Sequence, residues 1–187
     1  MTAAQAAVLA YAVVSRLAYA GFVGVALRRQ ERDAVFTRTG DATAGFRRFR
    51  RSAAVLMNND AVAFILLCVV TPSSFASPVS TGMTVAAGLL LIVLGLGVKL
   101  WAARTLGADA YYWHNFFVPP ASPQPVAAGP YRYTANPMYT IGYLQTYGLA
   151  LVFRSWPGLI AALISQTAIL IMYLAVEKPH FDRLHGR

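Results

Sequence analysis

The chain alternates long apolar runs with shorter polar segments, and five runs are candidates for membrane-crossing helices. They cover residues 6–27, 52–71, 79–100, 137–153 and 159–176. A helix needs about 20 mainly apolar residues to cross about 30 Å of hydrocarbon, and the first run has that length. The pattern therefore predicts an all-α membrane protein of about five transmembrane helices, folded as a single domain over residues 1–187.

The segments between the runs differ in character. Residues 28–51 contain eight arginines, which predict a surface loop or an interfacial helix beside anionic lipid. Residues 71–78 form an uncharged turn. Residues 105–128 are mixed and aromatic, and their prolines forbid a regular helix. We expect this stretch to be an interfacial segment with aromatic side chains at headgroup depth.

The third run contains four glycines, at positions 82, 88, 95 and 97. Small residues allow membrane helices to approach closely. Gly95 and Gly97 also match a G-x-G cofactor pattern loosely, and we interpret them as packing positions.

The composition agrees with lipid as the solvent. Only 12% of the residues are charged, against about 25% in an average soluble domain. Lys and Arg outnumber Asp and Glu by 16 to 7, but this excess lies between apolar runs, which argues against nucleic-acid binding. The single cysteine, Cys68, lies inside an apolar run and excludes an intrachain disulfide or a zinc site of several cysteines.

The basic residues also predict the orientation, because five spans place the termini on opposite sides. The arginines of residues 28–51 share one side with Lys99, Arg104, Arg132, Lys178, Arg183 and Arg187, whereas Arg154 falls on the other. Cytoplasmic segments are enriched in Lys and Arg. The N-terminus is therefore expected outside and the C-terminus in the cytoplasm, in a plasma membrane of the bacterial inner-membrane type.

Two polar clusters flank the last pair of runs. The first holds Tyr131, Arg132, Asn136, Pro137 and Tyr139, and the second holds Glu177, Lys178 and His180. Antiparallel helices joined by a short turn bring such ends together, so we expect one pocket at the cytoplasmic interface. Pro137 fits the first turn of a helix, whose N-terminal amides would suit a carboxylate.

These side chains are the parts needed to hold S-adenosylmethionine. Arg132 can pair with a carboxylate at two points, Glu177 can bind a cationic group or hydroxyls, and tyrosines can flank an adenine ring or a sulfonium. In the alternative interpretation, Arg132, Glu177 and Lys178 only anchor helix ends among the headgroups.

The second run contains an acidic residue, Asp60, at an expected depth of about 12 Å. Acids inside a membrane usually face a cavity or a partner. Together with Asn58 and Asn59 it could hold the ammonium of a phospholipid headgroup, or it could pair with Arg16 of the first run. The sequence leaves both interpretations open.

The stretch from Gly129 to Tyr139 resembles the G-P-Y-x-Y and N-P-M-Y motif of the small membrane methyltransferases. This superfamily includes isoprenylcysteine carboxyl methyltransferase and phosphatidylethanolamine N-methyltransferase. The Asn136-Pro137-Met138-Tyr139 form and the tail after Glu177 are closer to the phospholipid branch. The chain departs from the family pattern at Lys178, where the second glutamate of a pair usually stands.

The resemblance implies a cofactor pocket in a C-terminal helix hairpin, within about residues 94–187, and a lipid-like acceptor that enters from the bilayer. Motif matching places contacts to S-adenosylmethionine on Tyr131, Arg132, Asn136, Pro137, Tyr139 and Glu177. The expected activity is methyl transfer, with a phospholipid amine as a candidate acceptor. Glu177, His180 and Asp60 are the candidates to take its proton, and no metal is expected.

Two alternatives to this activity stay open at this point. One is carboxyl methylation of an isoprenylcysteine-type lipophilic acid. The other is a non-enzymatic membrane scaffold or subunit that uses the same hairpin. Neither the identity of the acceptor nor the oligomeric state can be read from the sequence.

Overall fold

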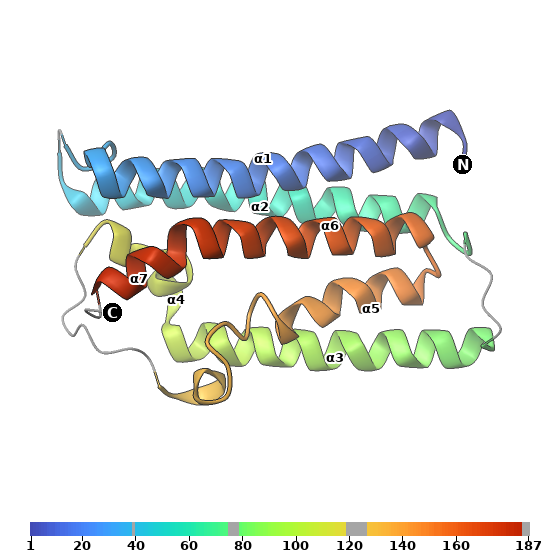
Figure 1. Ribbon diagram of the computed structural model, residues 1–187. Helices are drawn as coiled ribbons and strands as arrows, with labels where there is room; N and C mark the ends of the chain where they lie inside the picture. The colour runs from blue at the N-terminus through green and yellow to red at the C-terminus, as the bar shows by residue number, and fades with distance from the viewer. Residues whose placement is uncertain (39, 75–78, 119–126, 185–187) are drawn as a thin grey trace.

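The computed structural model describes residues 1–38, 40–74, 79–118 and 127–184, and every regular element within these ranges is helical. The long helices are α1 (Ala3–Asp33), α2 (Ala42–Val70), α3 (Thr81–Leu106) and α6 (Trp156–Met172). A π-helical turn, η4 (Tyr173–Glu177), joins α6 to α7 (Lys178–Leu184). Figure 1 shows α1, α2 and α6 side by side, with the short helix α5 (Leu144–Val152) between α6 and α3. Among the described residues, α1, α2, α3 and the combined helix Trp156–Leu184 are long and apolar enough to cross a membrane. The all-α membrane fold is thus confirmed.

The remaining elements are short. They are α4 (Ala108–Tyr111), α5 (Leu144–Val152) and the 3-10 turns η1 (His114–Phe116), η2 (Gly129–Arg132) and η3 (Ile141–Tyr143). Three parts of the expectations from the sequence lie outside the described residues. They are the prolines of the interfacial segment, at positions 119, 120, 123 and 125, the middle of the turn at 75–78, and the tail at 185–187.

The arginine-rich stretch 28–51 is more helical than a surface loop. α1 continues to Asp33 and α2 already begins at Ala42, so only a short connection separates them. Arg, Gln and Glu are good helix formers. Ala34 ends α1 in the left-handed conformation, and the Asp41 side chain caps α2 by accepting the Thr43 N–H.

The fourth apolar run forms a shorter helix than expected. Pro137 lies in a turn rather than in the first turn of a helix, and α5 begins only at Leu144. The nine residues of α5 span about 14 Å, less than the bilayer core. The turn η3 and the helix α5 nevertheless run alongside α3. The two chain termini lie at opposite ends of the bundle (Figure 1).

Charged contacts gather the expected segments at one end of the bundle. Arg50 at the start of α2 pairs with Asp109 of α4 at 3.1 Å. Arg183 of α7 pairs with Glu31 of α1 at 2.7 Å. The polar ends of α1, α2, α3 and α7 therefore share one end of the bundle, which also carries the sequence motif.

Glycines allow α3 and α5 to pack with their backbones in contact. A Cβ on Gly88 would lie 2.7 Å from the carbonyl oxygen of Gly148 and 2.9 Å from the backbone nitrogen of Val152. Gly95 is similarly closed off by the backbone of Gln145, whereas Gly97 faces open space. Gly95 thus has the packing position expected for it, and Gly97 does not.

Alanine at position 88 is expected to destabilise the fold by about 1–3 kcal/mol, because an added methyl group overpacks a backbone contact. The matched control is Gly97→Ala in the same helix, which should be neutral or stabilising by about 0.5–1 kcal/mol through helix propensity. Unfolding in detergent micelles measures both. Equal stabilities of the two variants would contradict the close α3–α5 contact.

Candidate functional site

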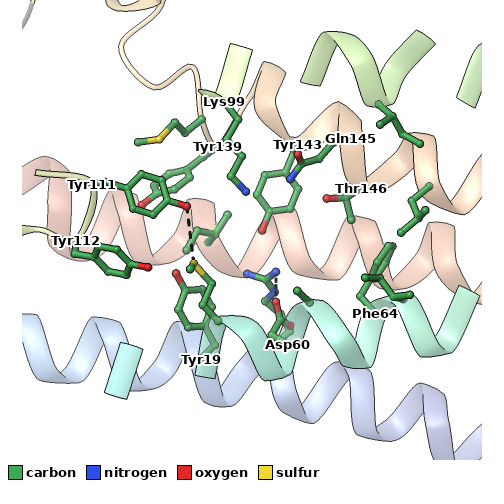
Figure 2. Close-up of a pocket in the computed structure, with 18 of the residues that line it drawn as sticks. Tyr19, Asp60, Phe64, Lys99, Tyr111, Tyr112, Tyr139, Tyr143, Gln145 and Thr146 are labelled. Atoms are coloured by element: carbon green, nitrogen blue, oxygen red, sulfur yellow. Dashed lines mark hydrogen bonds and ion pairs between the residues drawn. The ribbon is translucent and has the colours of Figure 1, made fainter. Parts of the chain in front are cut away.

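A cavity of about 320 Å³ opens among α1, α2, α3, α5, α6 and residues 111–113 (Figure 2). This volume lies within the range of small-ligand sites. One end is aromatic and is lined by Tyr19, Tyr111, Tyr112 and Tyr139, and Trp113, the residue after Tyr112, also lines the cavity. The other end is mainly apolar and includes Phe64, Ile65, Ile92 and Leu149. Three charged side chains also line the cavity: Arg16, Asp60 and Lys99.

Glu177 connects the two motif segments beside this cavity. The Tyr139 hydroxyl donates a hydrogen bond of 2.7 Å to Glu177 Oε1, and the Trp113 indole N–H donates to the same oxygen. Glu177 is 5% exposed. The polar ends that flank the last two apolar runs therefore meet, as expected.

The π-helical turn η4 has a local cause in the sequence. Pro179 lacks an N–H and its ring crowds the carbonyl four residues earlier, so a regular α-helix cannot continue through it. The five residues Tyr173–Glu177 widen into π-helix and the helix then resumes. Such bulges often occur at functional sites, and this one carries Glu177 on its last position.

Trp113 holds an unusual backbone conformation that turns its indole toward Glu177. Its φ of 59° and ψ of 36° are left-handed, which is a genuine outlier for a bulky residue. The ring is buried and meets Phe49 edge-on at 6.1 Å. The packing and the hydrogen bond to Glu177 compensate the backbone strain, which costs about 1–3 kcal/mol at such positions.

Asn136 shapes the turn that presents Tyr139. Its side-chain oxygen accepts the Tyr139 N–H at 3.1 Å, and its carbonyl accepts the Thr140 hydroxyl at 2.6 Å. Gln166 of α6 donates to the Tyr139 carbonyl at 3.0 Å. Asn136 and Pro137 are both buried and do not line the cavity. They therefore hold the Tyr139 side chain in place.

The two remaining motif residues occupy different environments. The Tyr131 hydroxyl is buried and has no hydrogen-bond partner within the described residues. Burial, and secondarily the nearby Glu177 carboxylate, raises the pKa of the Tyr131 phenol, so it stays a proton donor near neutral pH. Arg132 is exposed and makes no ion pair in the described part of the chain. Arg132 does not join Glu177 and Tyr139.

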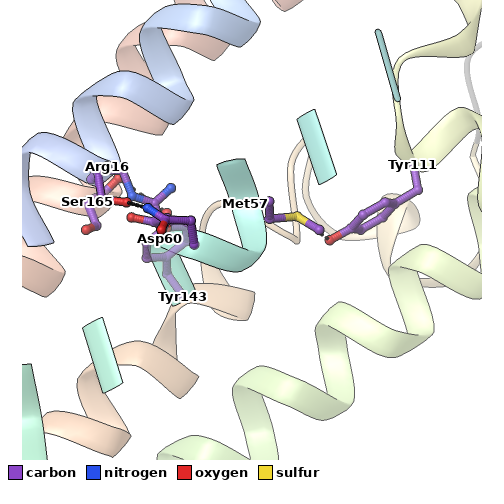
Figure 3. Close-up of polar contacts among 8 residues, drawn as sticks. Arg16, Met57, Asp60, Tyr111, Tyr143 and Ser165 are labelled. Atoms are coloured by element: carbon purple, nitrogen blue, oxygen red, sulfur yellow. Dashed lines mark hydrogen bonds and ion pairs between the residues drawn. The ribbon is translucent and has the colours of Figure 1, made fainter. Parts of the chain in front are cut away.

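Asp60 pairs with Arg16 and also lines the cavity. Arg16 Nη2 and Asp60 Oδ2 are 2.5 Å apart, with both side chains largely buried (Figure 3). Asn58 and Asn59 do not accompany Asp60, because both are exposed and Asn59 bonds instead to Ser15 at 2.6 Å. Of the two interpretations that the sequence left open, the pair with Arg16 is present, and Asn58 and Asn59 do not line the cavity with Asp60.

His180 lies apart from the cavity. Its ring stacks on Phe116 with centroids 3.7 Å apart, and its Nδ1 lies 2.7 Å from Glu31 Oε1. Its Nε2 is buried without a partner among the described residues. Of the three proposed proton acceptors, Asp60 lines the cavity, Glu177 binds two lining residues, and His180 does neither.

Several cavity residues were not singled out by sequence reasoning. Lys99 was counted only as a basic residue closing the third run, and Tyr19 and Tyr143 were hidden among apolar neighbours. A usable signal existed for Lys99, because ionisable residues at the edge of a membrane span often face a cavity. The tyrosines carried no comparable signal.

Comparison with known proteins identifies the relatives of this chain. The sequence profile of the phospholipid methyltransferases matches residues 83–187. A phosphatidylethanolamine N-methyltransferase of Talaromyces marneffei is 30% identical over 140 residues, which are 74% of this chain and 14% of that protein. The protein of the same name from Pyricularia oryzae is 31% identical over 74% of this chain and 14% of its own length. The one from Schizosaccharomyces japonicus is 36% identical over 56% of this chain and 12% of its own length. This chain thus spans only about one seventh of these relatives. No solved structure matches it.

Proposed function

Because this chain belongs to the phospholipid methyltransferase family, we propose that it transfers a methyl group from S-adenosylmethionine to the amine of a phospholipid headgroup. The observation that carries the proposal is the 2.7 Å hydrogen bond between Tyr139 and Glu177 at the edge of the cavity. This bond joins the two sequence segments that resemble the family motif. The curated relatives are named for the same reaction class.

The aromatic end of the cavity fits such a cofactor. Outside the cavity lining, the buried Tyr131 hydroxyl has no hydrogen-bond partner among the described residues and lies near the Glu177 carboxylate. These two groups offer a hydrogen-bond donor and an acceptor beside the aromatic end. Tyr111 and Tyr112 offer aromatic faces, which attract cations. When bound, the cofactor supplies an electrophilic methyl group on a sulfonium. We propose Tyr131, Tyr139 and Glu177 as its binding residues. Asn136 and Pro137 act through the position of Tyr139, and Arg132 is available at the surface.

Glu177 is our first choice for the group that accepts the acceptor's proton. Tyr139 and Trp113 both donate to Oε1, which leaves Oε2 for an incoming donor. A general base must lie within hydrogen-bond reach of the proton it takes. Asp60 is engaged by Arg16, and His180 is engaged by Glu31. We therefore propose Asp60 and His180 only as second candidates for the proton acceptor.

We further propose that the motif end of the bundle faces the cytoplasm and the N-terminus lies outside. The basic residues at this end support the orientation through the positive-inside rule. A plasma membrane of the bacterial inner-membrane type remains the proposed location. The protein is integral to the membrane, given its family and the four helices, within the described ranges, that are long and apolar enough to cross a membrane.

Labelled methyl transfer from S-adenosylmethionine into a total lipid extract tests the function directly. The expected product is an N-methylated phosphatidylethanolamine, identified by mass spectrometry. A label found only in a carboxyl methyl ester would contradict the amine acceptor, and a protein that neither transfers label nor binds S-adenosylhomocysteine would contradict the enzyme.

Asn136 provides a matched pair of variants for locating the site. Asn136→Ala removes the acceptor for the Tyr139 N–H and is expected to lower the rate by about 10²-fold, as displacement of positioned groups can. Asn136→Asp keeps that acceptor and is expected to retain most of the activity. Equal activity in both variants would place the site elsewhere.

A further inference from the structure

Among the described side chains that line the cavity, two are cationic and one is a carboxylate, whereas Glu177 bonds to Tyr139 and Trp113 without lining the cavity itself. Arg16 and Asp60 neutralise each other at 2.5 Å. Lys99 lines the same cavity, and its ammonium has neither an ion pair nor a hydrogen bond within the described ranges. An ammonium in apolar surroundings is costly without an anion nearby. The cavity is therefore built to receive a negative group.

The position of Lys99 along α3 indicates the depth of that group. Lys99 lies about two turns before α3 ends at Leu106. Trp101, which follows it, is 48% exposed, and Arg104 lies in the last turn of the helix. Trp and Arg at the end of a membrane helix mark the interfacial layer, which is also the layer of lipid phosphates.

Two tyrosine hydroxyl groups face the same cavity as the Lys99 amine. Figure 2 shows Lys99, Tyr19 and Tyr112 pointing into the same space, from α3, α1 and the segment after α4. In the part of the chain that the structure describes, neither tyrosine hydroxyl forms a hydrogen bond. A cation with two free hydroxyl donors matches the several acceptor oxygens of a phosphate.

The apolar part of the cavity indicates that the phosphate belongs to a lipid. Phe64, Ile65 and Leu149 continue the cavity wall from the charged centre. Ile65 is also 48% exposed on α2, so the cavity reaches the lipid-facing surface of the bundle. An acyl chain can leave along this wall, whereas free phosphate would gain nothing from it.

We propose that Lys99, with the hydroxyls of Tyr19 and Tyr112, binds the phosphate group of the acceptor phospholipid. This inference rests on the proposed function and names the subsite that selects its substrate. The headgroup amine then extends from the phosphate toward Tyr139 and Glu177, within the same aromatic end of the cavity. Lys99 is therefore a specificity-determining residue for lipids that carry a phosphate.

Binding measurements with Lys99 variants in detergent test the subsite without relying on turnover. The probe is dihexanoyl-phosphatidylethanolamine, with dihexanoylglycerol as the phosphate-free lipid and inorganic phosphate as the lipid-free anion. Lys99→Met is expected to weaken phosphatidylethanolamine binding by about tenfold or more, the loss of a charge-assisted contact. Lys99→Arg keeps the cation and should retain binding, and dihexanoylglycerol should bind wild type and Lys99→Met alike.

Three outcomes would overturn the proposal. The first is unchanged phosphatidylethanolamine binding in Lys99→Met. The second is binding of inorganic phosphate to wild type as tightly as the lipid binds. The third is loss of S-adenosylhomocysteine binding in Lys99→Met, which would assign the Lys99 amine to the cofactor carboxylate. Lys99→Gln serves as a second neutral variant if the methionine variant folds poorly. If wild type binds the phospholipid but not S-adenosylhomocysteine, the phosphate subsite stands and the methyl-transfer function fails.

Discussion

Replacing Glu177 by glutamine is expected to lower the initial rate of methyl transfer by about 10²-fold to 10⁴-fold, the contribution of a positioned acid–base group. The glutamine amide keeps one oxygen that can accept from Tyr139 and Trp113, but it cannot take a proton near neutral pH. The rate is measured with labelled S-adenosylmethionine and phosphatidylethanolamine in nanodiscs, and the thermal midpoint verifies folding. An unchanged rate in a folded Glu177→Gln protein would remove Glu177 from the chemistry.

The adjacent position provides the control for this experiment. Lys178 stands where the family usually has a second glutamate, and its exposed amine pairs with Asp182 at 2.7 Å on the surface of α7. Lys178→Gln removes a charge one residue from Glu177 without touching the cavity. We expect activity close to wild type, since exposed pairs of this kind contribute little. A loss equal to that of Glu177→Gln would point to a general charge effect at this helix end.

Replacing Asp60 by asparagine is expected to destabilise the protein by about 3–5 kcal/mol, the cost of leaving a buried charge without its partner. Arg16 is only 13% exposed, and its Nε already lacks a hydrogen-bond partner among the described residues. Reversible unfolding in mixed micelles measures the change. Retained stability would show that Asp60 is not needed to compensate Arg16.

A double variant separates the ion pair from a role in substrate binding. Arg16→Met combined with Asp60→Leu removes both charges and is expected to recover most of the stability, because an apolar pair of similar volume can replace a buried ion pair. Asp33→Asn breaks the exposed pair with Arg32 and should leave stability unchanged. If Asp60→Asn lowers stability but leaves the KM for phosphatidylethanolamine unchanged, Asp60 acts only through Arg16.

The sequence was sufficient for the class of fold and for the pairing of the two motif segments. Long apolar runs predict membrane helices because lipid leaves the backbone no partner but itself. The tight turn at Arg154 and Pro157 predicts an antiparallel hairpin, so the approach of Tyr139 to Glu177 followed from local rules. The family resemblance then indicated what such a pair of segments could bind.

Helix lengths and the content of the cavity were decided by tertiary structure. Hydropathy marks where lipid ends, whereas helices continue as long as backbone and packing allow. α1 and α2 therefore extend into the arginine-rich stretch from its two ends. The fourth run is apolar enough for a span, but Pro137 and the turn built by Asn136 delay its helix until Leu144. Apolarity alone does not report such local backbone constraints.

The sequence by itself determined an integral membrane bundle with a polar motif at one end, because these properties depend on residues close together in the chain. Only the tertiary structure decided that Asp60 pairs with Arg16, that Trp113 reaches Glu177 and that Lys99 lines the cavity without an ion pair to any described residue. These relations join residues far apart in sequence. The physical reason is that burial and charge compensation depend on which helix faces meet, and a periodic apolar pattern does not specify that choice.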